Sequence, residues 1–165
     1  MYVNRPSVSR WISLFYILTA VFLGVLGIWI ALAIPKIGLL VSIVIAAIDA
    51  LILYLIVSIY RTRYILTEDE VLIKAPILVG GSKKIRFKEV REVQRTFVPF
   101  GLRLFGASFY GGYYHIPSLG RTFMLITNYS DGVLIRTDKL NYIITPSNPD
   151  KFIERLRPRC MSNIN

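Results

Sequence analysis

Side chains that could carry out catalysis are few in this sequence of 165 residues. Its only histidine is His115 and its only cysteine is Cys160, so one chain cannot form a histidine pair, a His–Cys site or a disulfide. His115 stands next to Tyr114 and close to Pro117, a setting that favours packing over the role of a general base. The sequence therefore predicts a protein that is not an enzyme, with no catalytic residue, metal or cofactor.

Two further groups contain residue types that are used in catalysis or phosphate binding, but their positions in the chain do not suit those roles. Glu68, Asp69 and Glu70 are clustered carboxylates, but they fall in a predicted hairpin turn, where we expect them to be solvated. A group of glycines lies between residues 106 and 120, yet no Gly-Lys-Ser/Thr follows and no helix begins there, as a phosphate-binding loop requires. These glycines instead indicate bulges and tight turns.

The best functional candidate is a basic cluster between residues 83 and 95. Its members are Lys83, Lys84, Arg86, Lys88, Arg91 and Arg95. Residues 84–88 alternate, so Ile85 and Phe87 share one face of a strand and the cations share the other. Because a basic side chain near an anionic bilayer gains about 1 kcal/mol, the cluster predicts a site for anionic surfaces. The alternative interpretation is an ordinary solvated strand face.

The charge of residues 61–165, +8 from 17 Lys and Arg against 9 Asp and Glu, also favours an anionic partner. Lipid head groups are the nearest such partner for a chain held in a membrane. An equally open interpretation is that the positive charge aids solubility and orients the chain in the bilayer. Nucleic acid is not expected, because no nucleic-acid-binding motif is present.

Two long apolar runs must hold the chain in that membrane. Residues 11–34 contain no charged side chain, and residues 37–60 contain only Asp49. As helices, each would be about 36 Å long, against a hydrocarbon core of about 30 Å. Only Pro35 and Lys36 separate the runs, so we expect an antiparallel transmembrane hairpin. A cleaved signal peptide is the competing interpretation, but the first run is longer than such a segment and a second follows at once.

The flanking charges predict the orientation of the hairpin. Arg5 and Arg10 precede the first run, Arg61 and Arg63 follow the second, and Lys36 is the single cation between them. Since basic flanks stay on the cytoplasmic side, both termini are expected in the cytoplasm. The chain is accordingly predicted to be a multi-pass protein of the plasma membrane.

Asp49 is the candidate for a contact inside the membrane, together with small residues of both runs. Gly24 and Gly27 belong to a narrow stripe in the first run, and Ala46 to one in the second. Small residues let helices pack closely in lipid, and an ionisable group at that depth is a functional candidate by default. Two interpretations stay open: a hydrogen bond within the hairpin, for instance to Ser42, or a contact with another chain.

The rest of the chain has the pattern of one small β-rich domain. Short strands are expected at residues 64–67, 71–74, 84–88, 102–105, 108–115, 121–127, 133–137 and 142–145. A helix start follows at residues 146–150, after which Phe152, Ile153 and Leu156 share one face. The expected division is therefore a cytoplasmic tail (1–10), two helices (11–34 and 37–60), a domain (61–158) and a C-terminal tail (159–165).

Three stretches of this domain resemble the membrane-anchored bacterial pleckstrin-homology (PH) domain family. They are Tyr64-Ile-Leu-Thr with Val71-Leu-Ile, then Ile85-x-Phe87-x-x-Val90-x-x-Val93, and finally Tyr142-Ile-Ile-Thr-Pro-Ser-Asn-Pro-Asp-Lys-Phe-Ile. The resemblance covers about residues 61–157. It implies an α+β fold: a two-helix transmembrane hairpin followed by a seven-stranded, half-open barrel capped by a C-terminal helix. It implies no activity, because a fold alone does not specify function.

Two functions are consistent with these features. The first is a non-enzymatic, membrane-anchored interaction module that contacts anionic lipid head groups, its own copies or other membrane proteins. Lipid contact should then weaken as salt rises and depend on Lys84, Arg86 and Lys88. The second is an accessory or structural subunit of a larger integral membrane protein complex, which should be unstable without its partners.

Overall fold

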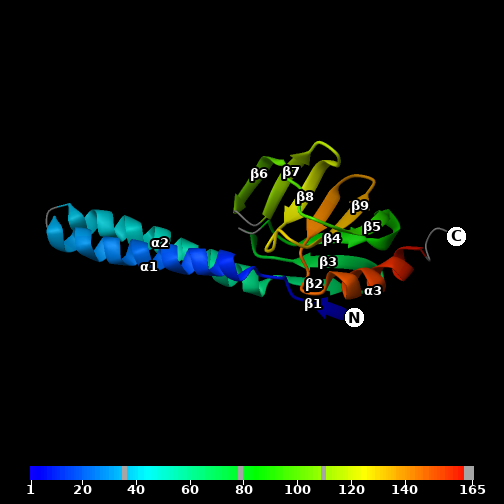
Figure 1. Ribbon diagram of the computed structural model, residues 1–165, viewed down its shortest axis with the longest axis horizontal. Coiled ribbons are helices and arrows are strands. Elements are labelled where there is room, and N and C mark those ends of the chain that lie inside the picture. The colour runs from blue at the N-terminus through cyan, green and yellow to red at the C-terminus, as the bar shows by residue number, and fades with distance from the viewer. Residues whose placement is uncertain (35–36, 78–79, 109–110, 162–165) are drawn as a thin grey trace. The chain divides into compact units, whose positions relative to one another are not determined.

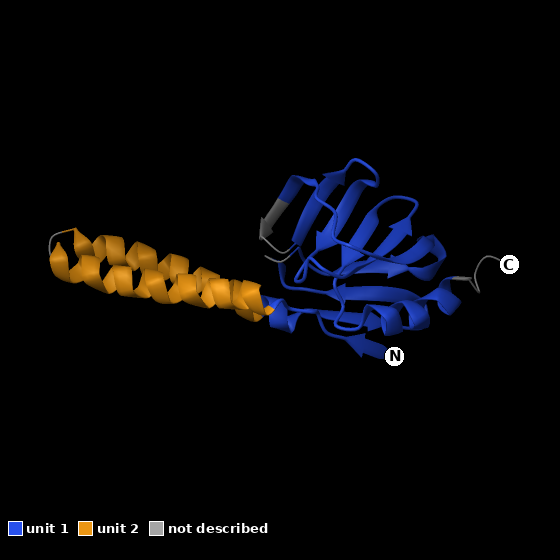
Figure 2. Ribbon diagram, in the orientation of Figure 1, with its two compact units in different colours: residues 1–9, 58–165 blue, residues 10–57 orange. Residues whose placement is uncertain are grey.

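The computed structural model describes residues 1–34, 37–77, 80–108 and 111–161, and it divides the chain into two compact units. Figure 2 shows them in different colours: residues 10–57 form one unit, and residues 1–9 together with 58–165 form the other. The long hairpin unit is helical, and the other unit holds the sheets and the C-terminal helix (Figure 1).

The helical unit consists of α1 (Arg10–Ala33) and most of α2 (Gly38–Arg61). Both helices are long and apolar enough to cross a membrane, as predicted; the predicted turn at Pro35 and Lys36 lies outside the described residues. The helices pack closely at Gly27, where an added Cβ would lie 3.3 Å from Cγ2 of Ile45. Close approach across a glycine is a usual way to hold helices together in lipid.

The first sheet has four antiparallel strands in the order β1-β2-β3-β4. Their bounds are β1 (Tyr2–Asn4), β2 (Arg63–Leu66), β3 (Glu70–Lys74) and β4 (Lys83–Arg86). Buried and accessible residues alternate along β2, β3 and β4, which is why hydropathy alone predicts these strands. A short 3-10 helix, η2 (Phe87–Glu89), then ends the sheet.

The second sheet has six strands in the order β5-β9-β10-β8-β7-β6. Their bounds are β5 (Val90–Thr96), β6 (Leu102–Ser108), β7 (Gly111–Ile116), β8 (Gly120–Leu125), β9 (Gly132–Thr137) and β10 (Asn141–Ile144). All neighbours are antiparallel except β10 and β8, which run parallel. Since β5 and β6 form opposite edges, the chain between them must cross the sheet.

The C-terminal helix α3 (Pro149–Met161) contributes to the main core. Phe152 and Leu156 are fully buried, and the ring of Phe152 meets that of Tyr64 edge-on with 6.4 Å between centroids. The side-chain oxygen of Asn148 accepts a hydrogen bond from the backbone N–H of Lys151 at 3.1 Å. This cap, with Pro149 in the first turn, explains why the helix starts where the sequence predicts.

The α+β class is confirmed, whereas the seven strands expected for a half-open barrel were too few. The described residues form two sheets, of four and six strands, with no closed barrel. The chain leaves the first sheet through η2, so β4 and β5 belong to different sheets. Strands β6 and β7 then extend the far edge of the second sheet instead of closing it.

The N-terminal segment belongs to the domain. Strand β1 pairs with β2 in a register that places Asn4 opposite Tyr64. Beyond it, the N–H of Ser7 donates to the carbonyl of Thr145 at 2.8 Å. Asn4 is only 4% exposed, and its side-chain oxygen accepts a hydrogen bond from Oγ of Ser147 at 2.6 Å. The hairpin is thus an insertion within the domain, between its first and second strands.

Candidate functional site

The six residues of the predicted basic cluster are divided between two sheets. Lys83, Lys84 and Arg86 lie on β4, an edge of the first sheet, and Lys88 lies in η2. Arg91 and Arg95 lie on β5, an edge of the second sheet. The six therefore do not make a single strand face, and each subgroup has its own surroundings.

Arg91 is paired with a carboxylate of the β9–β10 turn. Its Nε donates to Oδ1 of Asp138 at 2.7 Å and its Nη2 to Oδ2 at 3.1 Å. The hydrogen bond raises the pKa of Arg91 and lowers the pKa of Asp138. Because this pair is neutral, Arg91 adds little attraction for an anionic surface.

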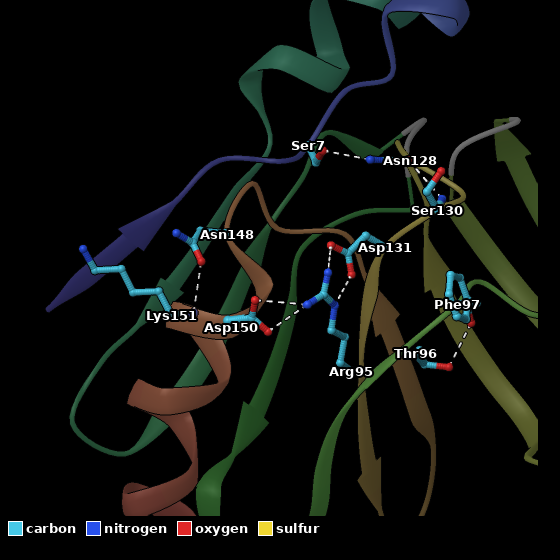
Figure 3. Close-up of polar contacts among 10 residues, drawn as sticks. All are labelled: Ser7, Arg95, Thr96, Phe97, Asn128, Ser130, Asp131, Asn148, Asp150 and Lys151. Atoms are coloured by element: carbon cyan, nitrogen blue, oxygen red, sulfur yellow. Dashed lines mark hydrogen bonds and ion pairs between the residues drawn. The ribbon is translucent and has the colours of Figure 1, made fainter.

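Arg95 joins three elements (Figure 3). Its Nε and Nη2 each donate to the carboxylate of Asp131 at 2.8 Å, and its Nη1 donates to that of Asp150 at 3.1 Å. Asp131 lies in the β8–β9 loop, and Asp150 lies in the first turn of α3. One cation faces two carboxylates here, so this group does not attract anions; it links β5, the loop and the start of α3.

The cations of β4 and η2 differ among themselves. Nζ of Lys84 lies 3.7 Å from Glu70, and Nζ of Lys83 lies over the rings of Tyr113 and Phe123 at 5.4 Å and 5.3 Å. Two exposed cations of this group, Arg86 and Lys88, have no carboxylate partner within the described part of the chain. They are therefore the members best able to attract an external anion.

Strand register reveals a second basic group that the sequence did not show. Arg63 at the start of β2 lies opposite Lys74 at the end of β3, and Lys83 at the start of β4 lies opposite Ile73. Arg5 directly follows β1, which also ends here. We call these four cations, Arg5, Arg63, Lys74 and Lys83, the basic end of the first sheet. Only pairing of strands could have found this group, since its members are far apart in sequence.

The opposite end of the same sheet carries the acidic residues. Glu70 begins β3, and Glu68 and Asp69 precede it in the turn from β2. Arg86 lies opposite Glu70 and so belongs to this acidic end. Helix α2 ends at Arg61, and therefore the chain reaches the basic end first when it leaves the helix.

Inside the hairpin, the structure brings together part of the predicted contact set. Oδ2 of Asp49 would lie 3.7 Å from a Cβ added at Gly24, so these two residues are neighbours. Oδ1 of Asp49 is buried and has no hydrogen-bond partner among the described residues. The hydroxyl of Ser42 bonds instead with the carbonyls of Gly27 and Gly38, each at 2.7 Å. The Ser42 interpretation was therefore wrong.

The remaining candidates differ from expectation at two points. Ala46 is exposed on α2, whereas Gly27 of α1 is buried at the contact with α2. His115 is exposed on β7, so the packing role expected for it was wrong. Cys160 is buried, and its desolvation raises the pKa of the thiol to about 11, which makes it a poor nucleophile. In the described residues no group of acidic, histidine or cysteine side chains is suited to a metal ion.

Two cavities lie beside the second sheet. One, of about 370 Å³, lies between β5 and α3 and is lined by Val93, Arg157 and Cys160 among others. Arg157 Nη2 donates to the carbonyl of Val93 at 3.4 Å, which covers part of the β5 edge. The other, of about 280 Å³, is lined by Arg95, Phe97 and residues of the β8–β9 loop. Neither contains an arrangement of acid, base and nucleophile.

The comparison with known proteins agrees with the two-sheet domain and its C-terminal helix. No curated protein and no solved structure matches the chain. Residues 62–160 match the family described as the bacterial PH domain, and this match runs from the end of α2 to the last turn of α3. Because the match spans more than half of the chain, the protein belongs to the bacterial PH domain family, with two long apolar helices preceding the matched residues.

Proposed function

We propose that this protein is a non-enzymatic, membrane-anchored interaction module whose PH-like domain contacts anionic lipid head groups. The observation that carries the proposal is the charge polarity of the first sheet. Cations on three neighbouring strands, with Arg5 directly after the fourth, meet at one end, and the acidic turn lies at the other. The basic end is also the end next to α2 along the chain.

The polarity suits a domain held close to a bilayer. A span that ends at Arg61 keeps Arg63 within a few residues of the membrane surface, where the potential of anionic lipids is still strong. At roughly 1 kcal/mol for each cation, loss of two should weaken surface contact about thirtyfold. The acidic turn at the opposite end of the sheet would be repelled by anionic lipid, so an arrangement with that end toward the bilayer is disfavoured.

The full chain in vesicles tests this proposal. Cys160 is replaced by alanine, and Ile77, which is 88% exposed and follows Lys74 closely, becomes a single labelled cysteine. We expect quenching of the label by nitroxide-bearing lipid head groups in anionic vesicles. Quenching should fall in zwitterionic vesicles and when salt is raised from about 0.05 to about 0.5 M.

A matched pair of double variants shows which cations matter. Lys74→Gln/Lys83→Gln removes two of the four cations of the basic end, and Arg86→Gln/Lys88→Gln removes the same charge near the acidic end. We expect the first double variant to abolish most quenching and the second to leave it nearly unchanged. Equal losses, or a larger loss from the second, would show that the basic end is not the contact surface.

A second function, that of an accessory subunit in a larger membrane complex, is favoured by Asp49. A carboxyl oxygen without a partner is costly within a candidate span, and a donor from another helix would lower that cost. Gentle extraction of the tagged chain, followed by mass measurement, tests this function. Foreign subunits in fixed ratio that are lost in Asp49→Leu would support it, and a particle of this chain alone would contradict it.

A further inference from the structure

Two exposed aromatic side chains lie on adjoining loops of the second sheet. Phe97, in the connection from β5 to β6, is 81% exposed, and Tyr129, in the β8–β9 loop, is 59% exposed. The loops touch, since the N–H of Val98 donates to the carbonyl of Tyr129 at 3.4 Å. We call Phe97 and Tyr129 the aromatic tip. Large exposed apolar side chains on two touching loops make this region a candidate interaction surface.

The aromatic tip lies at the end of the sheet to which the N-terminal segment is bound. Thr96, next to Phe97, pairs with Gly132, which closes the β8–β9 loop. At this end the N–H of Ser9 donates to the carbonyl of Thr127 at 3.0 Å. The same loop is held a second time, because Asn128 Nδ2 donates to Oγ of Ser7 at 3.0 Å (Figure 3). The aromatic tip therefore adjoins the loop residues that hold Ser7 and Ser9 of the N-terminal segment.

Ser7 and Ser9 directly precede a candidate membrane span in the sequence. Helix α1 begins at Arg10, the residue after Ser9, and Trp11 follows with 79% exposure. Residues bonded to Ser7 and Ser9 must therefore stay within a short distance of the bilayer surface. Aromatic side chains with one polar atom favour that interfacial layer, which fits Tyr129 and Trp11.

Charge at the tip is compatible with a lipid partner. Asp131, two residues from Tyr129, would by itself be repelled by anionic lipid. Its carboxylate is bound by Arg95 in a two-bond pair, and the second carboxylate on Arg95, that of Asp150, belongs to α3 and not to the loop. The exposed side chains of the loop are those of Tyr129 and Ser130.

We propose that the aromatic tip inserts into the interfacial layer of the lipid bilayer and forms a contact separate from the basic end. The proposal rests on the proposed function in one respect, since both require the domain to meet the bilayer. The two contacts differ in chemistry. Head-group attraction at the basic end weakens with salt, whereas insertion of Phe97 and Tyr129 does not. This difference makes the two separable by experiment.

The reporter leaves both aromatic residues intact. In the full chain with Cys160→Ala, Ser130→Cys carries an environment-sensitive fluorophore beside the tip, and Ser118→Cys is the matched control. Ser118 is also exposed, but it lies in the β7–β8 turn at the opposite end of the sheet. In vesicles we expect a blue-shifted emission from position 130, quenched by nitroxide lipids at low and high salt, and neither effect at position 118.

Paired variants then test the rings themselves. Phe97→Ser/Tyr129→Ser should abolish the blue shift at position 130, whereas Phe100→Ser/Leu102→Ser, which removes residues 97% and 71% exposed, should leave it unchanged. An unquenched label at position 130, with the label at position 77 still quenched, overturns the aromatic contact alone. Absence of quenching at both positions overturns the proposed function as well. A blue shift without lipid quenching, together with cross-linking between protein chains, also overturns the inference, because the tip would then bind protein.

Discussion

The backbone N–H of Ser9 donates a hydrogen bond to the carbonyl of Thr127, although 118 positions separate the two residues in the sequence and α1 begins at the next residue, Arg10. Both ends of the hairpin are consequently attached to the domain. Ser9, just before α1, is hydrogen-bonded to it, and β2, just after α2, is one of its strands. Residues 1–9 should therefore contribute to the stability of the domain.

Removal of the N-terminal segment should destabilise the domain. The comparison uses residues 58–165 alone and the same residues preceded by residues 1–9 through a glycine–serine linker that replaces the hairpin. We expect the version with residues 1–9 to melt at higher temperature, because β1 pairs with β2 and protects its edge. Thermal unfolding followed by circular dichroism measures the difference, and equal melting temperatures would contradict the role given to β1.

Asn4 should account for a definite part of that effect. Asn4→Ala removes a side chain that is only 4% exposed and whose oxygen accepts a hydrogen bond from Oγ of Ser147 at 2.6 Å, a net loss of about 0.5–1.5 kcal/mol for that bond. Val3→Ala is the matched control, since Val3 is 48% exposed on the same strand. Denaturant unfolding of the linked domain should show a clear loss for Asn4→Ala and a small one for Val3→Ala.

Two glycines of α1 should respond differently to the same substitution. Gly27→Ala places a Cβ 3.3 Å from Ile45 and should weaken helix packing, whereas Gly24→Ala meets Asp49 at 3.7 Å, an ordinary contact distance. We expect a lower aggregation temperature in detergent for Gly27→Ala than for Gly24→Ala. If Gly24→Ala were the more damaging change, close packing at Gly27 would not be what holds the hairpin.

The sequence predicted elements whose signals are local. Hydropathy indicated the two helices, alternation indicated the strands of the first sheet, and the Asn148 cap indicated the start of α3. Strand β1 has three residues, too few for a recognisable pattern. Its pairing with β2 depends on the hairpin bringing distant segments together, which no local rule contains.

The basic cluster shows why sites are harder to predict than elements. The carboxylates that pair with Arg91 and Arg95 are Asp138, Asp131 and Asp150, which lie 47, 36 and 55 positions further along the chain. A count of local charges therefore overestimates the attraction of residues 83–95 for anions. The basic end was missed for the converse reason, because pairing assembles Arg63 and Lys74 from different strands.

The Arg91–Asp138 pair should give the domain a distinct acid response. Hydrogen bonding to Arg91 lowers the pKa of Asp138 below its ordinary value of 3.8. The stabilisation is therefore complete above about pH 4 and is lost as the pH falls through the lower folded-state pKa. Arg91→Gln should lower the melting temperature slightly at pH 7 and make no difference at the acid limit. If the difference in melting temperature persisted at the acid limit, the Arg91–Asp138 pair would not be the cause of that difference.

Tyr64 should make the domain sensitive to alkali. Burial raises the pKa of its hydroxyl well above the ordinary value of 10, because the phenolate would lose its hydration in the core. A raised folded-state pKa means that the proton stabilises the fold. This contribution is present below pH 10 and is lost as the pH rises above it.

Tyr64→Phe isolates that effect with almost no change in packing. The hydroxyl has no hydrogen-bond partner of ordinary geometry among the described residues, so its removal should leave stability at pH 7 unchanged or slightly higher. Above pH 10 the variant should unfold at a higher denaturant concentration than the parent domain. Tyr142→Phe is the control, since Tyr142 is only half-buried and burial raises its pKa less. If Tyr64→Phe left the alkaline unfolding transition in place, the transition would have to come from another titrating group.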